Sequence, residues 1–228
     1  MSFQALLGLT FPPIAIAFRT APPAELPRVD AAGPSGCSYW RLAAEGESFY
    51  TEAADHYNCP IGAHTHGVDL PAEKAAELQA LVTTMVGMKY LEIAEVPDIP
   101  RRTSPFGVAM YGPFPQAPFV PDVVVVRGRA KQVMLLTEAA RMAGIGSEMA
   151  ARLRPTCAIL PETMRTGQAG ISLGCIGNRV YTQLGDDELY VAIPGPKVSE
   201  VVSKLGTILA ANRELERFHQ GRRAAGPK

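Results

Sequence analysis

PDVVVVRGRAKQVMLLTEAARMAG, residues 121–144, is the stretch that decides the fold class. Its four consecutive valines, 123–126, form a short apolar run after Pro-Asp, which is typical of a buried strand. The segment 130–144 that follows carries a helical pattern and ends at a glycine, a residue common just after helices. A buried strand followed by a helix indicates a protein that mixes sheet and helix.

Other segments extend this prediction in both directions. The apolar run 14–18, bounded by prolines, predicts a second buried strand. An apolar stripe at three- and four-residue spacing predicts a helix over 71–86, with Asp69 as its cap and Pro71 in its first turn. A second such stripe predicts a helix over 196–211. Further strands are expected at 48–51, 107–112, 179–183 and 188–193, and a flexible tail at 221–228.

The order of elements suggests an internal duplication. The first half runs through prolines, a strand, Cys37, Gly46, Cys59 and Gly62, and the second repeats this order with Cys157, Gly167, Cys175 and Gly177. The spacings agree only loosely, and chance alignment of frequent glycines is the alternative. Duplication predicts an α+β fold of two related α/β halves, 1–105 and 106–220, packed about a pseudo-twofold axis in one compact unit. Mixed or antiparallel sheets with flanking helices are expected.

The net charge and the N-terminal segment limit the partners and the cellular location that we expect. The chain has 22 basic and 22 acidic residues, so nucleic acid and anionic membranes are not expected partners. The apolar stretch 5–18 has no basic residue before it and contains two prolines, so a secretory signal is not expected. At 14 residues it is also too short to span a membrane. We therefore expect a cytoplasmic protein whose four cysteines are reduced, which favours metal or redox roles.

Three segments resemble a known family. They are CSYWRLAAEGESFYTEAADHYNCPIGAHTHG (37–67), YGPFPQAPFVPDVVVV (111–126) and ISLGCIGNRVYTQLGDDELYVAIPG (171–195). Together they are similar to the bacterial and archaeal proteins of domain-of-unknown-function family 169, over most of the chain. The resemblance implies a compact cytoplasmic protein in which the cysteines matter, and it supplies no substrate.

The four cysteines are the main candidates for a functional site. Glycine or proline lies within two residues of each of the four cysteines, Cys37, Cys59, Cys157 and Cys175, which places them at turns or at the starts of elements. Such loops can direct backbone N–H groups at a negatively charged iron–sulfur cluster, and Gly174, Gly177 and Asn178 would do this around Cys175. We therefore expect a four-cysteine 4Fe-4S site with a redox or Lewis-acid role on a small molecule, or with a redox partner protein. Zinc is the alternative, although the chain has no C-x-x-C pair.

Several other hypotheses stay open at this stage. The cysteines can be core or loop fillers, or Cys175 can be the nucleophile of a metal-free thiol enzyme, with Arg179 lowering the pKa of its thiol. His64 and His66, expected on one side of a strand near Cys59, are weaker metal ligands, and the alternative for them is a solvated loop. A metal-free small-molecule-binding protein, a non-catalytic partner subunit and a homo-oligomer also fit the sequence.

Overall fold

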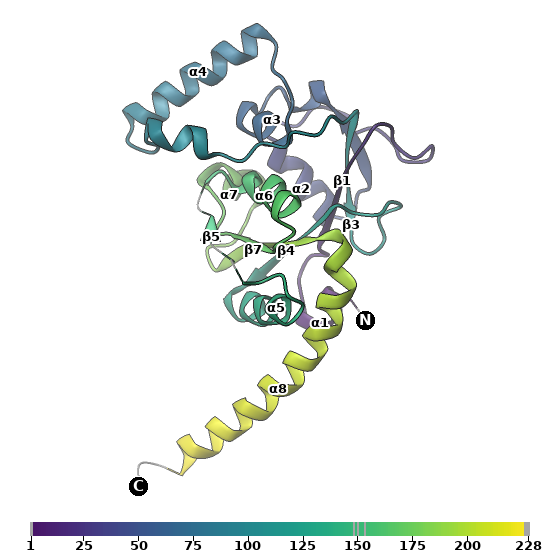
Figure 1. Cartoon of the computed structure of the whole chain (residues 1–228), viewed down its shortest axis with the longest axis vertical. Coiled ribbons are helices and arrows are strands. Elements are labelled where there is room, and N and C mark those ends of the chain that lie inside the picture. Colours follow the sequence, from purple (N-terminus) through teal and green to yellow (C-terminus); the bar gives the residue numbers. More distant parts are fainter. Residues whose placement is uncertain (1, 148, 150, 153, 226–228) are drawn as a thin grey trace.

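The computed structural model describes residues 2–225, other than 148, 150 and 153. They form an open seven-stranded sheet in the order β2-β3-β1-β4-β7-β6-β5, with helices on both faces (Figure 1). All neighbouring strands are antiparallel except β5 and β6. The expected mixed α+β class is confirmed. The strands are β1 (Ile14–Arg19), β2 (Phe49–Glu52), β3 (Val108–Pro113), β4 (Val123–Arg129), β5 (Ala151–Arg152), β6 (Gly170–Ser172) and β7 (Glu188–Pro194).

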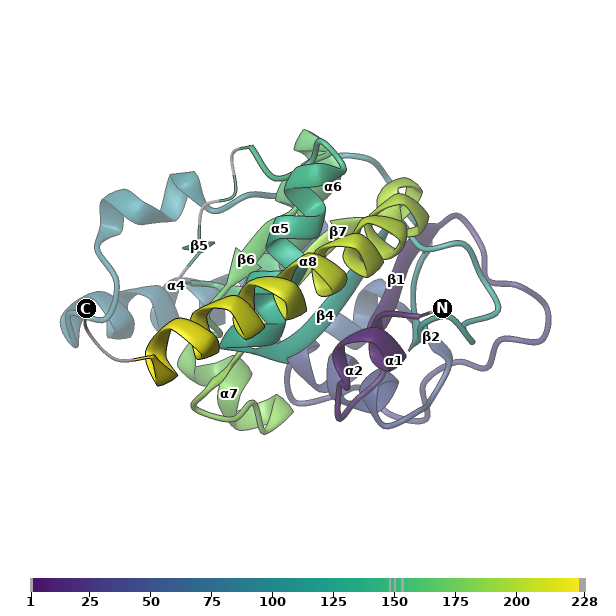
Figure 2. The same ribbon diagram turned by 90° about the horizontal axis from the view of Figure 1, so that it is seen from below.

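The helices form two layers on the sheet. One face carries α1, α5 and α8, and the other carries α2, α6 and α7, with α3 and α4 beyond them (Figures 1 and 2). The helices are α1 (Phe3–Leu7), α2 (Gly36–Ala44), α3 (Pro60–His66), α4 (Ala72–Gly87), α5 (Ala130–Met142), α6 (Ile159–Thr166), α7 (Ile176–Thr182) and α8 (Val198–Ala224). Short 3-10 turns are η1 (Ala53–His56), η2 (Ile93–Asp98), η3 (Thr156–Ala158) and η4 (Gly195–Lys197).

The valine run of β4 explains why both faces of the sheet are covered. Val123 and Val125 lie in the core under α2 and α6, whereas Val124 and Val126 lie in the core under α5 and α8. Successive side chains of a strand point to opposite faces, so a continuous apolar run needs an apolar layer on each side. The valine run of β4 therefore explains why helices cover both faces of the sheet.

Most of the expected strands are confirmed, and one is wrong. Strands form at the segments 14–18, 48–51, 107–112, 123–126 and 188–193, but 179–183 lies mainly in α7 and forms no strand. Valine and tyrosine in that segment favour a strand by composition. In the structure Asn178 and Thr182, four residues apart, are the buried positions, while Val180 is 66% exposed. This spacing is helical.

The expected helices are confirmed, with changes at their ends. The N-cap of α4 is Pro71 and not Asp69, and no side chain caps it. No residue of α4 is fully buried, so its apolar stripe faces a cavity and not a packed core. The last helix runs on through Ala224, into the expected flexible tail, whose residues 226–228 lie outside the described part of the chain.

Two strands that each begin a half of the chain, β1 and β4, lie side by side in the sheet. Outward from that pair, one side reads β1, β3, β2 and the other reads β4, β7, β6, β5. The sheet is also continuous across the expected boundary at 105 and 106, because β3 lies between β1 and β2. The division into halves about a pseudo-twofold axis is not shown by this order and stays a prediction.

Candidate functional site

All four cysteines lie where a helical segment begins, on the same face of the sheet. Cys37 is the second residue of α2, and Cys157 is the middle residue of η3, directly before α6. Cys59 and Cys175 are the N-cap residues of α3 and α7. Cys37 and Cys157 are buried, the other two are half-buried, and all four are free thiols.

Two contacts connect the start of α2 to its neighbours. Ser35, the N-cap of α2, donates from Oγ to Cys59 Sγ at 3.6 Å and so joins α2 to α3. On the other side, α7 packs against α2, and although burial raises the pKa of the Cys37 thiol, the nearby Asn178 amide of α7 offsets part of that rise. The start of α2 is therefore in contact with both α3 and α7.

Two further contacts connect the start of η3 to the same helices. α3 packs against η3, and although burial raises the pKa of the Cys157 thiol, the nearby Thr65 hydroxyl of α3 offsets part of that rise. Thr156 Oγ1 accepts a hydrogen bond from the backbone N–H of Cys175 at 2.7 Å. The four cysteine-bearing turns are thus joined in a closed ring, α2 to α3 to η3 to α7 and back to α2. We call it the cysteine ring.

Electrostatics couple the four thiols. Burial raises the pKa of Cys37 to about 12, and charge on Cys59 or Cys175 would raise it further. Burial raises the pKa of Cys157 well above its ordinary value, and Cys37, Cys59 and Cys175 act in the same direction. The two buried thiols are therefore neutral at pH 7 unless a positive group compensates their charge.

Asn178 and Gly62 show how tightly the ring is built. The side chain of Asn178 is buried, yet neither its Nδ2 nor its Oδ1 makes a hydrogen bond of ordinary geometry within the described residues. A Cβ on Gly62 would lie 2.9 Å from Cys59 Sγ, which is closer than real Cβ atoms come to other atoms. Glycine at position 62 therefore leaves room for this thiol, and the Asn178 amide has hydrogen-bonding capacity to spare.

The other residues expected around Cys175 lie on the same turn. Gly174 has a φ of +78°, a conformation that favours glycine, and Gly177 lines a cavity beside Cys175. Arg179 donates to the carbonyls of Leu173, Gly185 and Glu188, so its guanidinium ties the turn to the start of β7. These hydrogen bonds give Arg179 a role in positioning the turn.

The expectation that His64 and His66 face one side of a strand is wrong. Pro60 starts α3, so the two side chains project in different directions. His64 is half-buried with Nε2 3.4 Å from the Ile99 carbonyl, whereas His66 lies in the core and bonds the Gly62 carbonyl and the Tyr111 hydroxyl. Burial lowers the pKa of His66 to about 4 and that of His56, beside it, well below its ordinary value.

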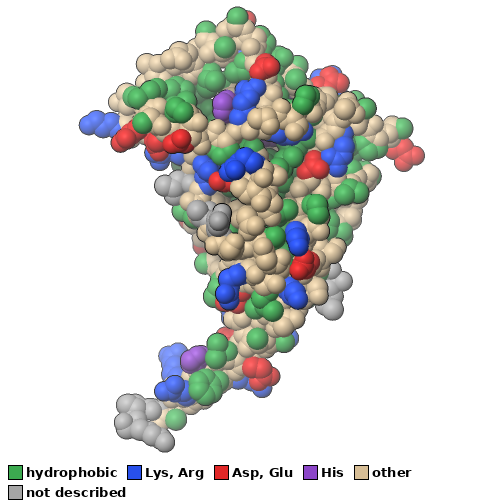
Figure 3. Space-filling model, in the orientation of Figure 1, with side chains coloured by type: hydrophobic (Ala, Val, Ile, Leu, Met, Phe, Trp, Pro, Cys, Tyr) green, Lys and Arg blue, Asp and Glu red, His purple; other side chains and the backbone are tan. Residues whose placement is uncertain are grey.

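An apolar cavity of about 240 Å³ opens next to the cysteine ring. Its floor and walls come from α3, α4, η2 and the start of α7, and Cys175 is one of its lining residues. The apolar stripe of α4 continues the cavity toward His64 through a smaller hollow of about 60 Å³. Apolar side chains gather over α4 and the segment after it on the surface (Figure 3).

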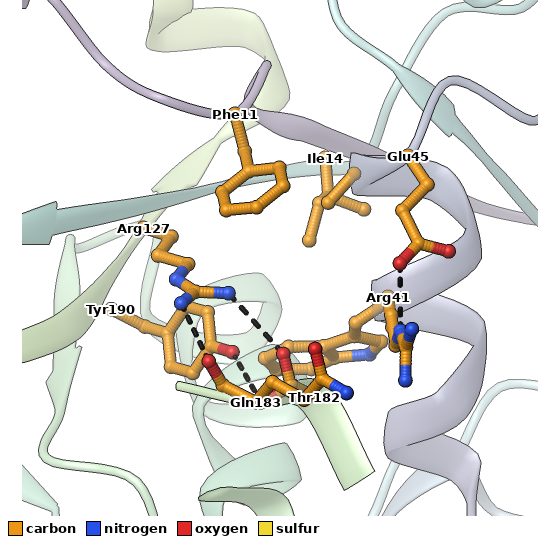
Figure 4. Close-up of a pocket in the computed structure, with 10 residues that line it drawn as sticks. Phe11, Ile14, Arg41, Glu45, Arg127, Thr182, Gln183 and Tyr190 are labelled. Carbon is orange, nitrogen blue, oxygen red and sulfur yellow. Dashed lines mark hydrogen bonds and ion pairs between the residues drawn. The ribbon is translucent and has the colours of Figure 1, made fainter. Parts of the chain in front are cut away.

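A second hollow, of about 50 Å³, lies at the far end of α7 (Figure 4). The rings of Trp40 and Tyr190 pack there edge to face, with their centroids 5.4 Å apart. Arg127 donates to the carbonyls of Thr182 and Gln183 and pairs with Glu188. Because these polar groups already pair with one another, we assign the hollow to holding the end of α7 in place.

The structure also bears on metal ions and membranes. Within residues 2–225 without 148, 150 and 153, no group of three or more His, Cys, Asp or Glu side chains has an arrangement that could hold a metal ion. Over the same residues, no helix has both the length and the apolar character needed to cross a bilayer.

Sequence reasoning missed the groups that complete the ring. Ser35 and Thr156, each one or two residues before a cysteine, were not expected to take part, and neither was Thr65. A hydroxyl residue just before a cysteine was the one available signal. The cavity under α4 was missed because its walls come from segments far apart in the sequence.

The fold and the cysteine ring define an α+β protein with a partly buried thiol site beside an apolar cavity. The model of domain-of-unknown-function family 169 (DUF169, described as "Uncharacterised ArCR") matches residues 2–204, so the chain belongs to this family. An uncharacterised protein of Methanocaldococcus jannaschii, MJ0308, is 26% identical over 156 residues, which cover 66% of this chain and 67% of that protein. No solved structure matches the chain. The resemblance seen in the sequence is confirmed.

Proposed function

We propose that the cysteine ring holds an iron–sulfur cluster of the 4Fe-4S type, with Cys37, Cys59, Cys157 and Cys175 as ligands. The observation that carries this proposal is the closed ring of contacts, which joins four cysteine-bearing turns from both halves of the chain. Bound there, the cluster would supply electron transfer, or Lewis-acid chemistry on a small molecule if one iron were open.

The donor set and its surroundings fit such a group. Four thiols, two of them buried, would carry several negative charges as thiolates, and a cluster's iron ions compensate that charge. The Asn178 Nδ2 has no hydrogen-bond partner among the described residues and can donate to a sulfur, as the Ser35 hydroxyl already does. Hydrogen bonds to sulfur are a common means by which proteins tune iron–sulfur centres.

A cluster and a single zinc ion require different spacings of their ligands. Four thiolates on one zinc, each about 2.3 Å from the metal, lie roughly 4 Å apart. The ligands of a 4Fe-4S cluster bind four different irons and stand farther apart. Among the described residues no group of three or more His, Cys, Asp or Glu side chains is arranged for a single metal ion, so zinc is our second choice.

We further propose that the two sides of the sheet arose by duplication, which would explain the four-cysteine pattern. Cys59 caps the helix after β2, as Cys175 caps the helix after β6. Cys37 lies in the first turn of α2, which precedes β2, and Cys157 lies in η3, directly before α6, which precedes β6. The first three strands outward on each side, β1, β3, β2 and β4, β7, β6, follow a corresponding order, which supports this equivalence. Each half would then contribute one buried and one half-buried ligand.

The chain's own residues would position the ligands and exclude water. Thr156 fixes the backbone of Cys175, and Arg179 fixes the turn that carries it. Burial keeps Cys37 and Cys157 away from solvent. Four free thiols suit a reducing compartment, and we propose a cytoplasmic location on that ground.

A metal-free thiol enzyme is the second candidate function. Cys175 is half-buried and lines the apolar cavity, so a ligand there could reach its thiol. Against this role, no hydrogen bond joins Cys175 Sγ to a histidine in the described part of the chain, and Arg179 bonds three carbonyls. Simple small-molecule binding and a partner-subunit role remain the plainer alternatives.

Purification without oxygen, followed by visible and electron paramagnetic resonance spectroscopy, tests the proposal. We expect a brown protein whose broad visible absorbance bleaches on reduction. Single Cys→Ser changes at positions 59 and 175 should each destabilise the centre to a similar degree, because duplication makes them equivalent. A colourless protein after reconstitution with iron and sulfide would reject the cluster, and loss of function on alkylation of Cys175 alone would favour the thiol enzyme.

A further inference from the structure

Two apolar hollows adjoin each other under α4. The larger, of about 240 Å³, lies beside Cys175, and the smaller, of about 60 Å³, lies beside His64. Four apolar side chains line both hollows: Ile61, Met85, Leu91 and Ile99. We call the two hollows together the α4 cavity. Apolar cavities with few polar groups are the usual binding sites of small molecules.

α4 forms one side of this cavity without being packed into the core. None of its residues is fully buried, although Leu78, Val82 and Met85 line the cavity from one apolar stripe. The opposite walls come from α3 and the start of α7. Apolar side chains beside an open hollow stay in contact with water, and covering them is favourable. An apolar occupant would therefore also hold α4 against the rest of the protein.

The α4 cavity offers no unpaired charge to a ligand among the residues that the structure describes. Arg154 Nη2 donates to both carboxylate oxygens of Glu95 at 3.2 Å, and the guanidinium lies over the Tyr90 ring, 5.1 Å from its centroid. In the smaller hollow, His64 Nε2 lies 3.4 Å from the Ile99 carbonyl. An ion that entered the cavity would lose its hydration without gaining a partner, so the walls exclude charged ligands.

The size of the cavity selects a small molecule over a protein segment. A helix with its side chains is about 10 Å across, so a helix of a partner could cover the mouth but could not fill the space. An engineered apolar cavity of about 150 Å³ binds benzene, which has six heavy atoms. By the same proportion, a hollow of about 240 Å³ takes roughly ten heavy atoms.

We propose that the α4 cavity binds an uncharged, hydrocarbon-like molecule of about ten heavy atoms, with its wider end against Cys175 and its narrower end toward His64. The apolar walls take up the whole ligand, and no wall residue calls for a polar group on it. Because Cys175 is part of the wall, the bound molecule would touch the cysteine ring. Its assignment as a substrate of that ring rests on the proposed cluster, whereas its binding does not.

Three compounds with ten heavy atoms each test the proposal on the full chain by calorimetry. n-Butylbenzene is apolar throughout, 3-phenylpropan-1-ol ends in a hydroxyl, and 3-phenylpropylammonium ends in a positive charge. We expect n-butylbenzene to bind at one site per chain. The alcohol should bind about tenfold more weakly and the ammonium ion about a hundredfold more weakly, because their polar ends lose hydration. No binding of n-butylbenzene, or equal binding of the ammonium ion, would overturn the proposal.

Two matched methionine variants test where the ligand binds. Met85 lines both hollows, whereas Met88, which is 67% exposed at the end of α4, lines neither. Met85→Trp should fill part of the cavity and weaken n-butylbenzene about tenfold, and Met88→Trp should leave its affinity unchanged. Equal affinities in the two variants would place the ligand elsewhere. If Met85→Trp instead broke up a dimer detected by sedimentation, a second copy of the chain would be the occupant and the proposal would fail.

Removal of one partner of the charge pair tests why ions are excluded. Arg154→Met leaves the Glu95 carboxylate without its guanidinium, so the lining would carry a negative charge. The ammonium ion should then bind about tenfold more tightly, while the affinity for n-butylbenzene changes little. Unchanged binding of the ammonium ion would refute the role given to the pair.

The outcome can be distinguished from failure of the cluster proposal. Binding of n-butylbenzene to a protein that holds no iron after reconstitution would support the cavity and reject the cluster. A brown protein that binds none of the three compounds would do the reverse. If both proposals hold, saturating n-butylbenzene should change the visible spectrum of the cluster, because the ligand then touches a wall formed by Cys175.

Discussion

The backbone N–H of Cys175 donates to Thr156 Oγ1 at 2.7 Å. Thr156, which directly precedes Cys157, therefore holds the turn that carries Cys175 in place. The two turns are 19 residues apart in sequence, and Thr156 is completely buried. This hydrogen bond fixes the start of α7, where Cys175 and Asn178 both enter the cysteine ring.

Thr156→Val should lower the free energy of unfolding by about 1–3 kcal/mol. Valine keeps the shape of the side chain but leaves the Cys175 N–H without an acceptor. Thr156→Ser retains the acceptor and should recover most of the loss, as measured by urea denaturation. If valine were as stable as threonine, the hydrogen bond would not be the feature that fixes this turn.

Gly62→Ala should displace the Cys59 thiol, because its new Cβ would lie 2.9 Å from Sγ. We expect the iron content to fall to less than half, while the far-ultraviolet circular dichroism spectrum is retained, since alanine favours a helix. Gly206→Ala in α8 is the control, as no atom lies within 4 Å of the added Cβ. Full iron content in Gly62→Ala would show that Cys59 is not a ligand.

Asn178→Leu should affect the cluster and the metal-free fold in opposite ways. The metal-free chain should be as stable as the wild type or more so, because a buried amide without ordinary hydrogen bonds is removed. The cluster should lose a donor to sulfur, so chelators should bleach its absorbance several times faster. Bleaching at the wild-type rate would argue that the amide does not serve the cluster.

Stability should fall as the pH drops from about 6.5 toward 4. The pKa of His66 is lowered from 6.5 to about 4 by burial, and burial also lowers that of His56. Below pH 6.5 the unfolded chain takes up protons that the folded chain refuses, so acid favours unfolding. The loss from His66 alone is roughly 3 kcal/mol at pH 4.

Urea midpoints at several pH values measure this effect, with His66→Gln as the comparison. The variant is less stable at neutral pH because it loses imidazole contacts to Gly62 and Tyr111, but its stability should depend less on pH over this range. Equal slopes in the two proteins would mean that His66 is not the group that titrates.

Local patterns in the sequence were enough to predict most of the fold. The valine run of β4 predicts a strand that is buried on both faces. Successive side chains of a strand point to opposite faces, so four consecutive valines place methyl groups on both. The strand predicted at 179–183 is wrong. Valine and tyrosine favour a strand there, but the buried positions, Asn178 and Thr182, have helical spacing. Which residues are buried depends on tertiary packing, and a short window does not record it.

The candidate site was predictable only in its residue types. The cysteines stood out because they lie beside turns, but their connection depends on Ser35, Thr65 and Thr156, which reach across from other elements. The alternation of His64 and His66 suggests a strand, but the proline at position 60 fits the first turn of a helix and begins α3. Contacts between distant segments follow from the sheet order, and no spacing rule predicts that order.

Iron and acid-labile sulfide counted per chain after purification without oxygen test the central claim most directly. The account predicts about four of each per chain, and large losses when any one of Cys37, Cys59, Cys157 and Cys175 is changed to serine. Fewer than one iron per chain after reconstitution, in a protein that keeps its circular dichroism spectrum, would contradict it.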